Sequence, residues 1–425
     1  MVQKEIPTKS NASVVPRPIL RSVVLFSDFF LIIMALYHLK PASRSLILES
    51  HGTAALPYIW IGSALVLLVA ITLYHYIVSN YGRFSIVLGT CVFFVMLLVL
   101  FWFALQTPGD IAPIGFYIFV DVFGVVLVEQ FWSLTNSIYT TEEGKRWYGL
   151  VGTGGLLGGA AGGGAAAMII NYTPLQTPDL LLVAAGILFA IVALTWFMGR
   201  LHMYEENDEL TPKPRSASDW RVLTHSRYLL LIAGALLLAQ LVSPLVEFQF
   251  MRIVENMYAE REARTAILSL FFSILNIISI AINVILTPLI LHYLGVLAGL
   301  LVQPLILATS SYGFYLHPTL IPAATMKISD RGLSYSINRA AKELLYIPVA
   351  PVIMYKAKAW IDMFGYRIFK VFGSLLIILL TQWTSLAVGY GDLSVVIIGG
   401  CIIWGVVLVY LHREYQRLTP VDGSD

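Results

Sequence analysis

The sequence predicts an all-α membrane protein with about twelve transmembrane helices. Hydrophobic residues make up 58% of the 425 residues and charged residues only 12%, about half the charged fraction of a soluble domain. Apolar runs long enough to cross the hydrocarbon core, about 20 residues each, recur along the whole chain. These two observations exclude an ordinary soluble fold.

The apolar runs predict where the spans lie. We expect spans near residues 20–39, 55–78, 83–106, 113–139, 148–171, 178–199, 228–251, 264–291, 293–315, 318–346, 366–385 and 392–412. The longest polar stretch, residues 200–227, follows the sixth span. It divides the chain into a tail (1–19), an N-terminal six-helix bundle (20–199), a central loop (200–227), a C-terminal six-helix bundle (228–412) and a second tail (413–425).

Basic residues predict the orientation of the spans. They gather in the N-terminal tail, in the loops after even-numbered spans and at the C-terminus, for example at Lys4, Lys145, Arg200 and Arg413. The opposite side holds chiefly Arg261 and Arg264. The positive-inside rule therefore places both termini and the central loop in the cytoplasm. Two six-span halves joined by a cytoplasmic loop indicate a major-facilitator-like architecture.

Charged residues inside spans indicate a functional path, because each costs about 2.5–3.5 kcal/mol at the bilayer centre. They occur in the first, fourth, seventh and tenth spans. The members outside the tenth span are Arg44 at the end of the first span, Asp121, Glu129, Glu247 and Arg252, whereas Asp28 lies near the cytoplasmic end of the first span. Spans 1, 4, 7 and 10 line the central cavity of a major-facilitator fold, so we expect these side chains to meet there.

The tenth span carries a polar stripe with helical spacing. Its members are Lys327, Asp330, Arg331, Ser334, Asn338 and Lys342. On one straight helix the stripe would be about 22 Å long. We expect a polar wall that presents cations to an anionic cargo; the alternative is a set of salt bridges that holds two halves together. The fourth span echoes this one, because Glu129 precedes WSLTNS with Asn136, as Asp330 precedes LSYSIN with Asn338.

Other features predict packing and not chemistry. The fifth span, residues 148–171, is rich in Gly and Ala, which lets helix backbones approach closely. Cys91 and Cys401 lie in apolar runs, so we expect no disulfide and no metal site. No spacing suits a catalytic triad, so we expect neither an enzyme nor a cofactor. The formal net charge of +2 gives no reason to expect nucleic-acid binding.

Four segments together resemble the ATP/ADP translocase (nucleotide transporter) family of intracellular bacteria and plastids. They are YHLKPASRSLILES (37–50), FWSLTNSIYTTEEGKRWYGLVGTGG (131–155), LVEFQF (245–250) and YSINRAAKELLYIP (335–348). The resemblance places Arg44 on the family's functional lysine, Glu247 on its functional glutamate and Lys342 on a shared lysine. The sequence departs at Ser45, at residues 337–341 and in the fourth span, where Asp121 only approximates a glutamate.

The resemblance implies an ATP-binding, alternating-access carrier in a bacterial inner membrane, monomeric and embedded in lipid. Arg44, Arg331 and Lys342 would then contact phosphate, while Glu247, Asp330 and Asp121 would pair with these cations in the empty state. One alternative is a proton-coupled transporter of another anion, such as an organic acid or a metal chelate, with Glu247 or Glu129 as proton carrier. A further alternative is a receptor or assembly factor in which the charges form structural salt bridges.

Overall fold

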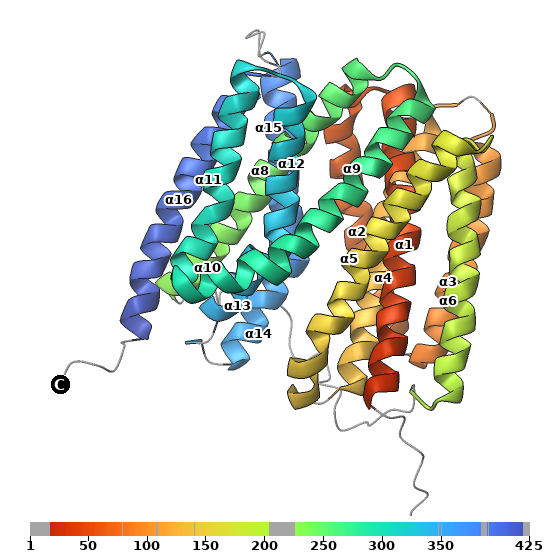
Figure 1. Cartoon of the computed structure of the whole chain (residues 1–425), viewed down its shortest axis with the longest axis horizontal. Coiled ribbons are helices and arrows are strands. Elements are labelled where there is room, and N and C mark those ends of the chain that lie inside the picture. The colour runs from red at the N-terminus through yellow and green to blue at the C-terminus, as the bar shows by residue number, and fades with distance from the viewer. Residues whose placement is uncertain are drawn as a thin grey trace, which may run out of the picture.

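The computed structural model describes residues 18–419 except 79, 108, 140, 204–225, 347, 350, 384–388 and 390. Nearly all of the predicted N-terminal tail, most of the central loop and the end of the C-terminal tail lie outside these residues. Every regular element of the described part is helical (Figure 1). The all-α fold class is therefore confirmed.

The first helices form what we call the N-terminal group. It contains α1 (Pro18–Ser50), α2 (Leu56–Val78), α3 (Arg83–Ala104), α4 (Ile111–Ile138), α5 (Thr141–Tyr172) and α6 (Leu180–Arg200), with the short 3₁₀ helices η1 (Thr53–Ala55) and η2 (Thr177–Asp179). Helix α1 packs against α4, α5 and α6 and so lies at the centre of this group. It also continues well past the predicted end of the first span, which places Arg44 inside the helix and not at its end.

The remaining helices form the C-terminal group, which is less regular. It contains α8 (Arg227–Met257), α9 (Arg261–Ala281), α10 (Thr287–Tyr293), α11 (Gly295–Leu316), α12 (Leu320–Tyr335), α13 (Ile337–Leu345), α14 (Pro351–Trp360), α15 (Tyr366–Ile378) and α16 (Leu393–Leu418). Single π-helical turns continue three of them: η3 (Ile282–Leu286) joins α9 to α10, η4 (Ile361–Gly365) joins α14 to α15, and η5 (Leu379–Trp383) extends α15.

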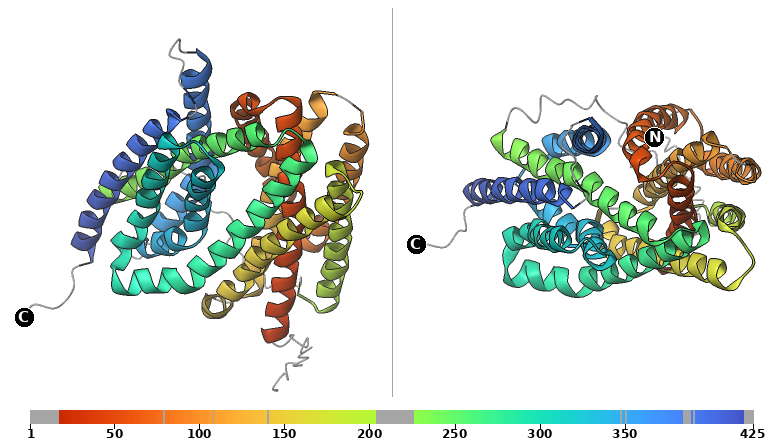
Figure 2. Two further views of the ribbon diagram at one scale, coloured as in Figure 1. Left: turned by 45° about the horizontal axis from the view of Figure 1, so that its top comes forward. Right: turned by 90° about the horizontal axis from the view of Figure 1, so that it is seen from above.

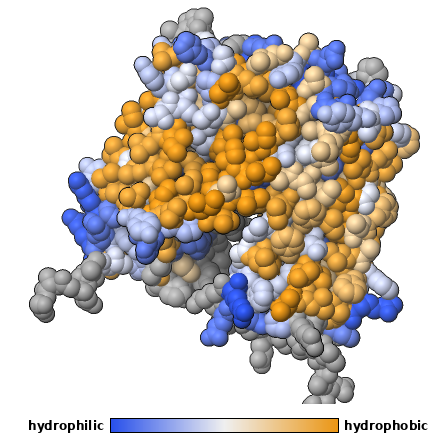
Figure 3. All heavy atoms as spheres, viewed as in Figure 1, coloured by the Kyte–Doolittle hydropathy of each residue, from blue (hydrophilic) through white to orange (hydrophobic). Residues whose placement is uncertain are grey.

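The chain is a multi-pass membrane protein. Eleven helical segments of the described residues are long and apolar enough to cross a bilayer. On the face that Figure 3 shows, an apolar band crosses the middle of the molecule, and polar residues gather toward its upper and lower edges. The predicted span 318–346 is not among the eleven, because it consists of two shorter helices, α12 and α13.

The break between α12 and α13 corrects the prediction of one straight polar stripe. Ser336 has φ −116° and ψ −95°, outside the helical region. Its hydroxyl donates to the Gly332 carbonyl at 2.6 Å, while its backbone N–H turns to Leu333. The side chain thus replaces the helical backbone bond, a substitution for which serine is well suited. Residues on either side of Ser336 therefore cannot share one face.

The glycine-rich α5 packs against helices of both groups. A Cβ on Gly162 would lie 2.6 Å from the Met34 carbonyl oxygen of α1, and one on Gly163 would lie 2.7 Å from the Ser269 carbonyl oxygen of α9. Only glycine allows backbones to approach this closely on two sides. The prediction that this segment serves close packing is confirmed. Helices α2 and α15 form a second contact between the groups.

The two groups meet at one edge of the molecule and separate toward the other (Figures 1 and 2). At the closed edge, Tyr58 Oη donates to Gln382 Oε1 at 2.7 Å, and Ser45 Oγ donates to the Arg261 carbonyl at 2.7 Å. Glu255 accepts hydrogen bonds from the backbone N–H and the hydroxyl of Thr53. The open edge carries the start of α1 and the end of α16, and a hollow separates the groups there (Figure 3).

Replacing Gly163 by alanine should destabilise the protein, because the new methyl group meets the backbone of α9. Overpacking of this kind costs about 1–3 kcal/mol. Gly152 lies in the same helix, and a Cβ there would have no neighbour within 4 Å. The Gly152→Ala control should be neutral or gain up to about 1 kcal/mol from helix propensity. Thermal melting in detergent measures both, and equal melting temperatures would contradict the packing argument.

Candidate functional site

A polar cavity lies between the two groups of helices. It holds about 580 Å³ of space, including the part that opens to solvent. Its lining comes from α1, α2 and α4 on one side and from α8, α9, α12 and α15 on the other: Tyr37, Lys40, Arg44, Trp60, Tyr117, Gln240, Ser243, Pro244, Glu247, Phe272, Leu275, Lys327, Arg331 and Lys370. The cavity thus draws on both groups.

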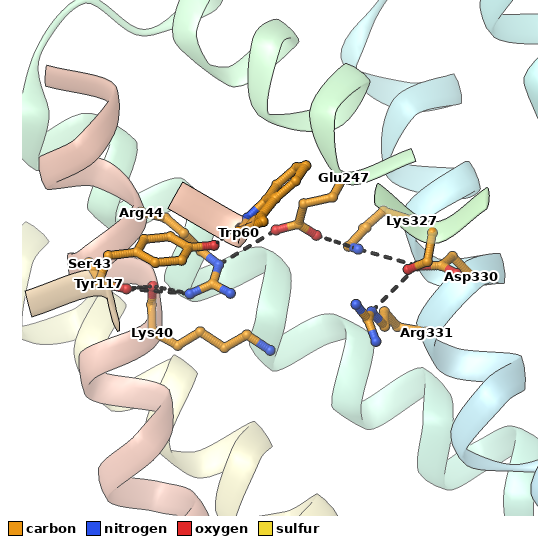
Figure 4. Close-up of polar contacts among 10 residues, drawn as sticks. Lys40, Ser43, Arg44, Trp60, Tyr117, Glu247, Lys327, Asp330 and Arg331 are labelled. Atoms are coloured by element: carbon orange, nitrogen blue, oxygen red, sulfur yellow. Dashed lines mark hydrogen bonds and ion pairs between the residues drawn. The ribbon is translucent and has the colours of Figure 1, made fainter. Parts of the chain in front are cut away.

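Helical spacing brings the basic side chains into this cavity in pairs. Lys40 and Arg44 are four residues apart on α1, and Lys327 and Arg331 are four residues apart on α12. Side chains with this spacing lie on one face of a helix. The two pairs face each other across the cavity, with Glu247 of α8 between them (Figure 4).

A chain of alternating charges connects the two groups (Figure 4). Arg44 Nε lies 3.5 Å from Glu247 Oε1, and Glu247 Oε2 forms an ion pair with Lys327 Nζ. Lys327 Nζ lies 3.3 Å from Asp330 Oδ2, which is 3.4 Å from Arg331 Nε. We call these five residues the ion chain. Four of them are buried, Lys327 to 1% exposure, so each charge depends on its neighbours for compensation.

Neighbouring polar and aromatic groups hold the ion chain in place. Ser243 Oγ donates to Asp330 Oδ2 at 2.8 Å. The Arg44 guanidinium donates to the Lys40 carbonyl at 3.2 Å and lies 5.1 Å from the centre of the Tyr117 ring. Trp60 Nε1 in turn donates to Tyr117 Oη at 2.8 Å. The basic groups are therefore oriented before any ligand arrives.

Basic side chains outnumber carboxyl groups in this cavity. Five line it (Lys40, Arg44, Lys327, Arg331 and Lys370) against one lining carboxyl group, Glu247. Lys40 Nζ lies 5.3 Å from the Tyr37 ring centre and 5.0 Å from that of Phe272. Among the described residues, no carboxyl oxygen lies within 4 Å of the Nζ of Lys40 or Lys370. Such a surplus suits a ligand with several anionic oxygens.

Sequence comparison with known proteins relates this chain to a family of transporters. The protein family described as "TLC ATP/ADP transporter" matches residues 113–328 and 320–415. The chain belongs to this transporter family. It is 24% identical over 347 residues to ADP,ATP carrier protein 2 of Chlamydia pneumoniae, which covers 68% of the chain and 63% of that relative. It is 25% identical over 355 residues to ADP,ATP carrier protein 4 of Rickettsia conorii, covering 71% and 68%. The chain thus spans less than two thirds of the first of these relatives.

Solved structures of transporters share the fold. A crystal structure of the peptide transporter POT in complex with sulfate aligns with TM-score 0.68 at 13% identity, over 96% of this chain and 98% of that one. A bacterial homologue of the iron transporter ferroportin in its inward-facing state aligns with TM-score 0.63 at 13% identity, over 92% and 98%. The major-facilitator-like architecture predicted from the sequence is confirmed in this family member.

The structure brings half of the predicted site residues together. Arg44, Glu247, Lys327, Asp330 and Arg331 form the ion chain. Asp121 lies outside the cavity lining, where it accepts a hydrogen bond from Ser63 Oγ at 2.6 Å. The Asp121 carboxyl group interacts electrostatically with two residues of the cavity lining, Arg44 and Lys370.

The other four predicted residues lie apart from the ion chain. Glu129 and Asn136 are exposed on α4, and Asn136 Oδ1 accepts a hydrogen bond from Tyr148 Oη at 2.8 Å. Asn338 Nδ2 donates to Gln303 Oε1 at 2.8 Å, and Lys342 Nζ donates to Tyr366 Oη at 3.0 Å. The break at Ser336 explains why Asn338 and Lys342 do not line the cavity. Both residues lie on α13, after the break, whereas Lys327 and Arg331 lie on α12, before it.

Sequence reasoning missed Lys40 and Lys370. The predicted eleventh span began at residue 366, which made Lys370 look like a residue of the helix end. The helical segment in fact begins at Pro351 and continues through η4, so Lys370 lies near its middle. The expected set of charged spans, 1, 4, 7 and 10, was therefore incomplete. Lys40 could have been found from the sequence. It lies in the segment that resembles the transporter family, four residues before Arg44 and therefore on the same helix face.

Replacing Glu247 by glutamine should strongly destabilise the ligand-free protein, because Arg44 and Lys327 lose their shared carboxylate. Breaking a buried pair costs about 3–5 kcal/mol. Glu414 provides the control, since its partners Arg227 and Arg417 are each 71% exposed. The Glu414→Gln change should cost less than about 1 kcal/mol. Chemical unfolding of the two variants compares them, and similar losses would show that the ion chain is not needed for stability.

Proposed function

We propose that this chain exchanges nucleotides, ATP for ADP, across a membrane by alternating access. The observation that carries the proposal is the surplus of basic side chains in a cavity between two groups of helices. Triphosphate and diphosphate groups present several anionic oxygens in a row, which matches paired lysines and arginines. The names of the relatives, ADP,ATP carrier proteins of Chlamydia and Rickettsia, support the same cargo.

In this proposal the cargo takes over the partners of Glu247. The empty site holds Arg44 and Lys327 against Glu247, and Lys327 and Arg331 against Asp330. Phosphate oxygens entering the cavity compete with these carboxylates for the basic groups. Lys40 and Lys370 add positive charge without an existing ion pair among the described residues. The buried basic groups stay compensated during this exchange, because phosphate oxygens replace the carboxylates as their partners.

The aromatic lining gives the cargo a second set of contacts. Tyr37, Trp60, Tyr117 and Phe272 share the cavity with the basic residues. A flat heterocyclic base stacks well on such rings. A nucleotide therefore uses both parts of the lining, whereas inorganic phosphate uses only the basic part.

The two groups of helices are the moving halves in this proposal. They contact each other through α5 with α9, α1 with α9 and α2 with α15, and they separate toward the open edge. The open edge carries the start of α1 and the end of α16, and the positive-inside rule predicts that this side faces the cytoplasm. The structure then corresponds to an inward-open state in a bacterial inner membrane, and the chain works as a monomeric carrier and not as an enzyme.

Purified protein in liposomes loaded with ATP should take up labelled ADP with saturable kinetics. Lys40→Gln and Lys370→Gln should each raise KM about tenfold or more, because a hydrogen bond to a charged group contributes about 1.5–3 kcal/mol. Lys358→Gln is the matched control, since Lys358 pairs with the exposed Glu343 outside the cavity. It should leave KM unchanged.

The same liposomes test the competing cargo. A panel of organic acids and metal chelates is offered with and without a proton gradient. Counter-exchange of an organic anion without any nucleotide uptake would overturn the nucleotide assignment. Absence of saturable uptake for the whole panel would overturn transport itself.

A further inference from the structure

A second, smaller cavity lies inside the N-terminal group, apart from the central cavity. It has room for about one water molecule. Its lining comes from α1, α3, α4 and α6: Asp28, Ile32, Val87, Cys91, Leu127, Gln130, Phe131, Leu134 and Ile191. None of these residues lines the central cavity. The role proposed for that cavity therefore leaves this one unexplained.

The Asp28 carboxyl group is buried here without a partner. The residue is 5% exposed, and its Oδ1 atom has no hydrogen bond. Among the described residues, none donates a hydrogen bond to Asp28 or forms an ion pair with it. The other titratable group of the lining is Cys91, and the α5 glycines Gly154, Gly155 and Gly158 pack against Phe26, Phe29 and Phe30 of α1. No positive charge of the described residues therefore forms an ion pair with an ionised Asp28.

Gln130 contributes a second acceptor without a donor. Its Nε2 donates to Thr90 Oγ1 at 2.7 Å, which leaves Oε1 buried and without a hydrogen bond. Among the described residues, no group donates a hydrogen bond to either acceptor oxygen. An ionised carboxylate in such a place carries a large desolvation cost. A proton on Asp28 removes the charge and turns a carboxyl oxygen into a hydrogen-bond donor inside the cavity that Gln130 also lines.

We propose that Asp28 is a proton-binding site of this protein and that its occupancy sets the pH dependence of transport. The second part rests on the proposed transport function, whereas the first does not. A metal ion is a poorer occupant, because the cavity offers two unsatisfied oxygens and the described residues contain no cluster of three acidic, His or Cys side chains. A proton needs only one donor oxygen and one acceptor.

A neighbouring cavity provides an approach to this site. It is lined by Tyr74, Val78, Arg83, Ile86, Val87, Gln130, Ser133 and Leu134, so it shares Val87, Gln130 and Leu134 with the cavity of Asp28. Arg83 is the first residue of α3, at the open edge of the molecule. Polar groups thus lead from that edge through Gln130 to Asp28.

Helix α1 links the proton site to the central cavity. Lys40 and Arg44 follow Asp28 on the same helix by about three to four turns. An ionised Asp28 draws water or a cation between α1 and its neighbours α3, α4 and α6. Loss of the proton at alkaline pH therefore loosens the packing of the helix that carries half of the basic pairs, and transport slows.

Infrared difference spectra of the purified protein, titrated with pH, test the site without any cargo. A protonated buried carboxyl group gives a C=O stretching band, which should be present at neutral pH, disappear at alkaline pH and be absent from Asp28→Asn. Gln130→Leu should shift this band without removing it, because the hydrogen-bond acceptor is lost. Cys91→Ala is the control for the lining and should leave it in place.

If Asp28 is instead ionised and accepts a hydrogen bond from a reversed Gln130 amide, no variant should show this band, and that result would overturn the proton site.

The pH dependence of transport has its own test. Wild-type exchange should fall severalfold at alkaline pH, while Asp28→Asn should keep its neutral-pH rate throughout. Identical pH profiles in the two proteins would overturn the coupling. Failure of all cargo to exchange would contradict the transport proposal and leave the infrared test intact.

Discussion

The ion chain from Arg44 to Arg331 is the interaction on which the rest of the structure depends. It places five charged groups inside a membrane protein, where an isolated charge is costly. The alternation of positive and negative charges lowers this cost, because each carboxylate pairs with two basic neighbours. The same arrangement offers basic groups for which another anion would compete with the carboxylates.

Close helix packing places the ion chain at the boundary between the two groups. The glycines of α5 let α1 and α9 approach its backbone from opposite sides, so α1 can present Arg44 toward Glu247 of α8. Contacts such as Tyr58 with Gln382 close only one edge of this boundary. The cavity therefore lies between two groups of helices, and not inside one of them.

The sequence predicted the fold class and the centre of the site because both follow from simple energetics. Long apolar runs require membrane helices, and charges within them require partners, which identified Arg44, Glu247 and Lys327. The break at Ser336 was not predictable from helical spacing, because it depends on one side-chain hydrogen bond to Gly332. Lys370 was missed because the helix begins fifteen residues before the apolar run does.

Glu129 and Asn136 show a different limit. The sequence around Glu129 and Asn136 is similar to that around Asp330 and Asn338. Glu129 and Asn136 nevertheless lie exposed on α4, whereas Asp330 is buried. A similar motif in the two groups therefore does not give a similar environment. Which face of a helix meets the cavity depends on neighbours far away in the chain, such as α8 and α12, and local spacing does not contain that information.

The central claim is that cargo phosphates and Glu247 compete for Arg44 and Lys327. The rise in melting temperature on adding ADP, compared between the wild-type protein and the Glu247→Gln variant, tests it most directly, because a ligand stabilises the folded state that binds it. The account predicts a larger rise in the variant, whose basic groups lack their carboxylate until ADP arrives. An equal rise in both proteins, or no rise in either, would contradict it.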